Sequence, residues 1–166
     1  QIEGVTAASI MDMQLTGTVS QAMNIQLPGQ TQDNALPPIS QMAAGFDIVK
    51  TAGFTLLAGR DFSETYQRDW DQTHGDHATA AVIITESLAR KAGYNQVQDA
   101  IGQQWLLPGD NPVLQMKVVG VVADIQIGSA LKQQEPLILI CGRSPMTYGN
   151  ILLNLQPEHA VSARSK

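Results

Sequence analysis

Short apolar runs, separated by glycine and proline, follow one another along most of the sequence, and their spacing is mostly that of strands. Two such runs near the start, 6–17 and 21–29, show loose alternation, and we expect them to pair as a meander. The polar residues 29–38 end in two consecutive prolines. Because proline disfavours helical geometry in the residue before it, this stretch predicts a loop that enters the next segment in an extended conformation.

A short helix is predicted next, because Phe46, Val49 and Ala52 recur at helical spacing. Gly53 follows the last of these residues, and glycine readily adopts the left-handed conformation that ends many helices. The apolar residues 54–59 then predict a strand or an extended run.

A strand that leads directly into a helix is the clearest local signal in the chain. Residues 81–84 form an apolar run typical of a buried strand. Thr85 is placed to cap the helix that follows, and Glu86 lies in its positively polarised first turn. A basic pair lies near the other end of this helix, and Gly93 is placed to end it.

Apolar and β-branched runs predict four further strands, within residues 101–112, 114–126, 136–142 and 149–157. Asp124 follows one of these buried runs, at a position where α/β folds often keep catalytic groups. No second carboxylate or histidine accompanies it at a fixed spacing. We therefore expect Asp124 to cap a helix or stabilise a turn.

Length and charge limit the functions that need to be considered. A chain of 166 residues with 43% hydrophobic residues forms one domain or two small ones and can bury a core. Its formal net charge of −5 argues against a nucleic-acid partner, because phosphate binding needs clustered lysine and arginine. The single cysteine, Cys141, lies in an apolar run and is expected to be a small buried side chain rather than a reactive thiol.

The most polar part of the chain, residues 63–79, has no period that would bury one face, and it predicts a solvated loop. This loop carries nitrogen and oxygen atoms of the kind that bind zinc, on Asp69, Asp71, His74, Asp76 and His77. A metal-dependent hydrolase, or a periplasmic binding protein, that uses loop 69–77 is therefore the alternative function. No glycine-rich phosphate loop and no GxSxG motif occurs, so we predict no cofactor and no catalytic residue.

The stretch Gly59-Arg60-Asp61-Phe62 raises a separate question, because it places two opposite charges at the end of an apolar run. Such a pair can be catalytic, or it can hold a turn. The local sequence leaves both readings open.

Four segments together, 45–64, 80–93, 100–105 and 117–140, resemble in order and spacing the MacB-like periplasmic core domain of ABC-transporter permeases. The resemblance runs over about residues 1–156. Threonine at position 85 departs from the asparagine usual in that family, but threonine also caps helices. The residues that carry the motif are Gly59, Arg60, Asp61, Phe62, Thr85, Glu86, Gly102, Gly120 and Asp124.

The resemblance implies an α+β fold in two subdomains. A porter-like α+β unit would be built from both chain ends, residues 1–62 and 147–166. A mixed sabre-like unit, residues 63–146, would be inserted between them. In this interpretation Arg60 and Asp61 belong to a turn, with Phe62 packed beneath it, and the motif is structural.

The same resemblance implies a non-catalytic domain on the periplasmic side of the inner membrane, between two transmembrane helices of a permease. Both ends of the sequence read like interrupted segments, and we expect them to lead to those helices. The implied partners are the chain's own transmembrane helices, a cytoplasmic nucleotide-binding subunit or domain that hydrolyses ATP, and, in the best-known relatives, a periplasmic adaptor protein. The isolated chain is expected to be a monomer.

Overall fold

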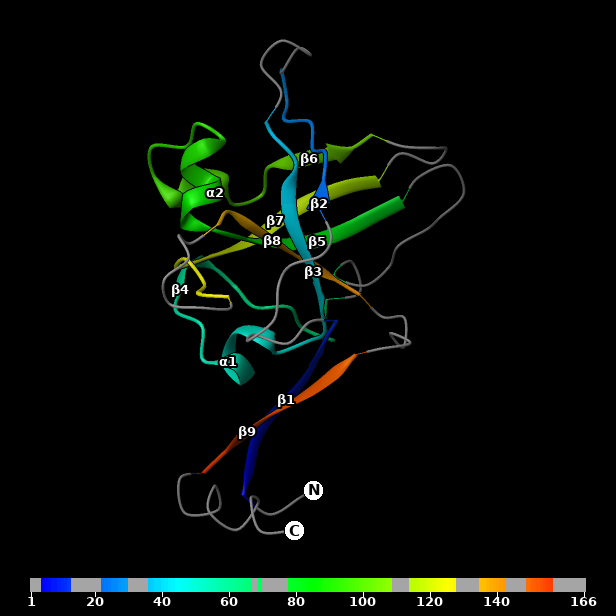
Figure 1. Cartoon of the computed structure of the whole chain (residues 1–166), viewed down its shortest axis with the longest axis vertical. Helices are drawn as coiled ribbons and strands as arrows, with labels where there is room; N and C mark the ends of the chain where they lie inside the picture. The colour runs from blue at the N-terminus through cyan, green and yellow to red at the C-terminus, as the bar shows by residue number, and fades with distance from the viewer. Residues whose placement is uncertain are drawn as a thin grey trace.

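A mixed β-sheet organises the chain, with short helices beside it (Figure 1). The computed structural model describes residues 4–12, 22–29, 36–66, 69, 78–108, 114–127, 135–142 and 149–156. The strands are β1 (Val5–Met11), β2 (Ala22–Met23), β3 (Ile39–Ala44), β4 (Leu56–Gly59), β5 (Ala78–Thr85), β6 (Gln104–Leu107), β7 (Leu114–Val122), β8 (Leu137–Cys141) and β9 (Asn150–Leu155). The helices are α1 (Ile48–Ala52), α2 (Glu86–Lys91) and the 3₁₀ helix η3 (Val97–Ala100). The predicted α+β class is confirmed.

The strand order in the sheet is β4-β7-β5-β8-β3-β1-β9, with β2 added to β3 and β6 added to β7. Two pairs, β5 with β7 and β3 with β8, are parallel, and the other pairs are antiparallel. β1 and β9 form a two-stranded ribbon that extends away from the rest of the sheet (Figure 1). Within the named strands, one residue pair, Met11 with Ala44, joins this ribbon to β3.

Both faces of the central strands are buried, which explains the unbroken apolar run of β5. Because side chains alternate along a strand, Ala81 and Ile83 lie in one core, whereas Val82 and Ile84 lie in the other. α1 covers the first core, together with Phe62 and residues of the β1/β9 ribbon. α2 covers the second, together with Trp105 and the apolar side chains that follow β2.

Two glycines allow β4 to approach β7 closely. Gly59 and Gly120 are direct partners in this antiparallel pair. A Cβ atom at Gly120 would lie 2.4 Å from the carbonyl oxygen of Arg60, and one at Gly59 would lie 2.2 Å from that of Val119. Gly59 also has φ 76, a left-handed conformation that glycine adopts without strain. The chain can therefore turn at Arg60 only because neither glycine carries a side chain.

The predicted helices are confirmed, and their ends follow the sequence signals. α1 ends at Gly53, which has φ 72, and the N–H of Phe54 donates to the carbonyl of Val49 at 2.9 Å. After α2, Gly93 has φ 91, and its N–H donates to the carbonyl of Arg90. The N–H of Tyr94 donates to the carbonyl of Ala89 at 3.1 Å. This last pair of bonds is a Schellman motif, which satisfies carbonyls that the helix leaves open.

The predicted meander of the first two apolar runs is wrong. β1 pairs with β3 and β9, and β2 pairs with β3. One edge of β3 is shared between them: Ile39 and Ser40 pair with β2, and Ala44 pairs with β1. Within the described residues, the third strand therefore brings the first two together.

The predicted division into residues 1–62 with 147–166, and 63–146, stays a prediction. β3 and β4 lie before residue 62, and they pair with β8 and β7, which lie after it. Hydrogen bonds of the sheet therefore cross the predicted boundary.

Cys141 is buried, with 1% of its surface exposed, as the sequence predicted. It ends β8 and packs in the core covered by α1. The pKa of its thiol is raised to about 12, mainly by burial and also by the nearby carboxylates of Asp69 and Asp61, whereas Arg60 opposes the shift.

Replacing Gly120 by alanine should destabilise the fold by about 3 kcal/mol, because the added methyl group meets a backbone carbonyl that cannot move aside. Gly29→Ala is the matched control: Gly29 has φ 76 but open space around it, so only backbone strain of about 1 kcal/mol is expected. Urea denaturation of both variants measures the difference. Equal losses would show that the close approach of β4 to β7 is not constrained.

Cys141 should make stability fall in alkaline solution. The unfolded chain loses the thiol proton near the ordinary pKa of 9.0, whereas the folded chain retains it to about pH 12. The stabilisation from this group is therefore complete below pH 9 and declines by about 1.4 kcal/mol per pH unit above it. Cys141→Ala lacks this decline, so the stability difference between the two proteins should shrink from pH 8 to 11. A difference that stays constant would contradict the prediction.

Candidate functional site

Several side-chain hydrogen bonds hold the turn after β4. Its path begins with the N–H of Arg60, which donates to the carbonyl of Val119 on β7 at 2.9 Å. Phe62 is fully buried in the core below, and its carbonyl accepts from the N–H of Asp47 at 3.0 Å. The predicted packing of Phe62 beneath a turn is therefore observed.

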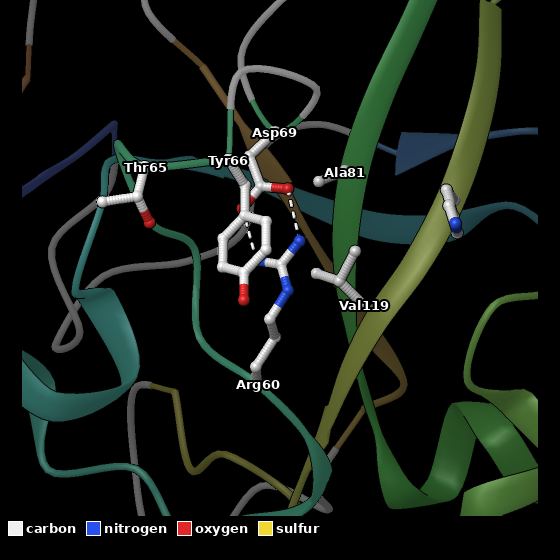
Figure 2. Close-up of a pocket in the computed structure, with 7 residues that line it drawn as sticks. Arg60, Thr65, Tyr66, Asp69, Ala81 and Val119 are labelled. Atoms are coloured by element: carbon white, nitrogen blue, oxygen red, sulfur yellow. Dashed lines mark hydrogen bonds and ion pairs between the residues drawn. The ribbon is translucent and has the colours of Figure 1, made fainter.

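Arg60 does not pair with its neighbour Asp61 through its side chain. Its guanidinium holds both carboxylate oxygens of Asp69, at 2.5 and 2.7 Å, in the bidentate geometry that makes such pairs strong. The same group donates to the backbone carbonyl of Asp61 at 3.0 Å and lies 3.8 Å from the centre of the Tyr66 ring. Figure 2 shows the guanidinium held between the ring and the carboxylate.

Asp69 is 1% exposed, although it lies in the polar segment for which we predicted a solvated loop. Its carboxylate also accepts from the N–H of Ser63 at 3.1 Å, and its own N–H donates to the carbonyl of Tyr66 at 2.8 Å. The carboxylate of Asp69 therefore holds the turn at two points, the side chain of Arg60 and the backbone of Ser63. A buried carboxylate needs such partners, since an unpaired buried charge is very costly.

Asp61 has a different role. One carboxylate oxygen accepts from the N–H of Lys50 at 3.1 Å, and the other accepts from the N–H of Phe62 at 2.7 Å. Lys50 lies in the first turn of α1, whose own N-cap residue, Asp47, makes no side-chain cap bond. Burial raises the pKa of Asp61, and the backbone N–H groups that it accepts from partly oppose this. Asp61 thus caps α1 from outside the helix.

The start of α2 is built in a similar way. Thr85 occupies the N-cap position, as predicted, but its hydroxyl makes no cap bond. The hydroxyl instead accepts from the N–H of Leu137 at 3.0 Å, where the β5–β8 pairing ends. Asp124 replaces it as the cap and accepts from the N–H of Ser87 at 2.9 Å, which confirms the predicted capping role of Asp124. Glu86 binds Arg90 on the exposed helix surface, with an N–O distance of 2.6 Å.

The remaining motif glycine, Gly102, lies after η3 with φ 82, and its N–H donates to the carbonyl of Val118 on β7 at 2.8 Å. The predicted metal candidates His74, Asp76 and His77 lie outside the described residues. Within the described part of the chain, no three histidine, cysteine, aspartate or glutamate side chains are grouped to hold a metal ion. No described helix is long and apolar enough to cross a membrane.

A pocket of about 600 Å³ opens beside the Arg60–Asp69 pair (Figure 2). In Figure 2, Ala81 and Val119 line the wall of the pocket that strands β5 and β7 form. The residues that line it are Arg60, Thr65, Tyr66, Asp69, Ala81, Lys117 and Val119.

Sequence reasoning missed the pairing of Arg60 with Asp69 and the pocket beside it. The two residues are nine positions apart, across a segment without periodicity. From the sequence alone, the adjacent Asp61 was the evident partner for Arg60. The signal that could have helped is the acid at position 69 within reach of a motif arginine, but several other acids in the same segment compete with it.

The sequence matches no family model, and no curated protein is significantly similar to it. Solved structures do share the fold. The periplasmic region of MacB from Actinobacillus actinomycetemcomitans superposes with a TM-score of 0.58 at 12% identity, over 99% of this chain and 64% of that one. A domain of a Porphyromonas gingivalis protein described as a permease gives 0.59 at 18% identity, over 98% of this chain and 67% of that one.

The extracellular domain of the noncanonic ABC-type transporter YknZ from Gram-positive bacteria gives a TM-score of 0.52 at 13% identity, over 96% of this chain and 71% of that one. The chain therefore has the fold of the MacB-like periplasmic domains of ABC-type permeases. It spans about two thirds of the length of these structures.

Arg60→Ala should lower the free energy of unfolding by about 2–3 kcal/mol, because it leaves the buried carboxylate of Asp69 without its main partner. Arg90→Ala is the matched control, since it breaks the exposed pair with Glu86 and should cost less than about 0.5 kcal/mol. Chemical denaturation of the two variants makes the comparison. If both lose the same small amount, the turn does not depend on Arg60.

Proposed function

We propose that the chain is the extracytoplasmic domain of an ABC-transporter permease, on the periplasmic side of the inner membrane. The observation that carries the proposal is the fold shared with three such domains over 96–99% of the chain. The motif residues support it, because the described contacts of Arg60, Asp61 and Asp124 hold turns and helix ends. In a domain without catalytic activity, the role of such contacts is to maintain the fold.

The two chain ends also fit a domain inserted between membrane helices. The N–H of Gln156 donates to the carbonyl of Gly4 at 2.8 Å, so the first and last described residues lie side by side at one end of the β1/β9 ribbon. Two transmembrane helices of one permease could connect to this end without crossing the domain.

The β1/β9 ribbon offers a surface for the rest of such a permease. No residue of β1 or β9 carries a charge, and Ile151 and Leu153 on β9 are 75% and 48% exposed. Neighbouring apolar side chains exposed on one strand often mark an interaction surface. The partners in this proposal are the chain's own transmembrane helices and a cytoplasmic nucleotide-binding subunit or domain. Its ATP hydrolysis would be coupled through the helices to export or to a periplasmic adaptor protein.

The division into porter-like and sabre-like subdomains, and the monomeric state of the isolated chain, belong to the same proposal. The alternative, a metal-dependent hydrolase or binding protein using loop 69–77, loses one candidate ligand. The carboxylate of Asp69 is already bound by Arg60 and by the N–H of Ser63.

Cysteine labelling in cells tests the location of the domain. In the complete protein with every native cysteine replaced by alanine, Cys141 included, Gln98→Cys places a thiol on an exposed residue of η3. A membrane-impermeant maleimide should label this thiol in intact cells with a permeabilised outer envelope. The protein with only its native, buried Cys141 is the control and should stay unlabelled until it is denatured. Labelling of residue 98 only after the inner membrane is broken would place the domain in the cytoplasm and refute the proposal.

A further inference from the structure

The proposed transporter function does not account for the pocket beside Arg60, and the chemistry of this pocket points to a ligand of its own. It lies between the turn after β4 and the strands β5 and β7 (Figure 2). Its volume of about 600 Å³ is within the range of small-molecule sites.

The described lining of the pocket is positively charged in an acidic protein. Among the described residues that line it, three carry a formal charge near neutral pH: Arg60 and Lys117 are cations and Asp69 is an anion, so their sum is +1, against −5 for the whole chain. Arg60 and Asp69 neutralise each other in their bidentate pair. Lys117 is exposed, and its ammonium has no ion pair or side-chain hydrogen bond with the described residues. Within the described lining, the available charge is therefore that of Lys117.

The rest of the lining is largely apolar. Lys117 pairs with Ala81 across the parallel β5–β7 ladder, and both residues line the pocket. Val119 lies two residues further along β7, on the same face. The Tyr66 ring, half exposed and stacked on Arg60, forms a further wall.

We propose that this pocket binds a monocarboxylate with an apolar body, such as a medium-chain fatty acid. The carboxylate accepts hydrogen bonds from the ammonium of Lys117, and the apolar chain lies over Ala81 and Val119 toward the Tyr66 ring. The one available cation of the described lining matches one negative charge, so a dianion would keep one charge unpaired. A cationic ligand would be repelled by Lys117. This inference does not depend on the assignment to a transporter.

Binding of decanoate to the isotope-labelled chain, followed by NMR below the micelle-forming concentration, tests the proposal. We expect saturable shifts that are largest at Lys117, Val119 and Tyr66. Decanol has the same chain without the charge and should bind about tenfold more weakly, the usual effect of losing a charge-assisted hydrogen bond. Acetate, which lacks the apolar body, should cause no saturable shift.

Two lysine variants make the test specific. Lys117→Gln should weaken decanoate binding about tenfold, to the level of decanol, and Lys117→Arg should retain most of the affinity. Lys91→Gln makes the same change of net charge at an exposed lysine on α2 and should leave the affinity unchanged. The absence of saturable binding, equal affinities for decanoate and decanol, or equal effects of Lys117→Gln and Lys91→Gln would each overturn the proposal.

Discussion

The close approach of β4 to β7 at Gly59 and Gly120 determines how the chain leaves the edge of the sheet. Because no side chain separates the two strands, the backbone of Arg60 can bond to Val119 and turn back over the core. Phe62 then enters the core, and Asp61 meets the start of α1. The bidentate Arg60–Asp69 pair then holds the turn in place. The motif residues therefore depend on one another, because each needs the backbone to follow this same turn.

These contacts answer the question that the Arg60-Asp61 sequence raised. The two charges are adjacent in sequence but have separate partners: Arg60 binds Asp69, and Asp61 binds backbone N–H groups. Asp124 at the start of α2 shows the same principle, since a carboxylate from the end of one strand caps a helix that follows another.

Features with a local cause could be predicted from the sequence. The ends of α1 and α2 follow from Gly53 and Gly93, and the buried strand before Thr85 follows from its apolar run. Features that depend on distant partners could not. The pairing of β2 with β3 depends on which strand edge is open, and the burial of Asp69 depends on an arginine across the turn. Thr85 occupies the predicted N-cap position, but its hydroxyl makes no cap bond for the same reason, because it accepts from the backbone N–H of Leu137 instead.

Native-state hydrogen exchange tests most directly whether this turn is a rigid part of the core. The amide protons of Arg60 and Ser63 donate to Val119 and to the carboxylate of Asp69. If the turn opens only when the protein unfolds, both amides should exchange as slowly as those of β7, with the free energy of global unfolding. Exchange of these amides at the rate of an exposed loop, while β7 stays protected, would contradict the account.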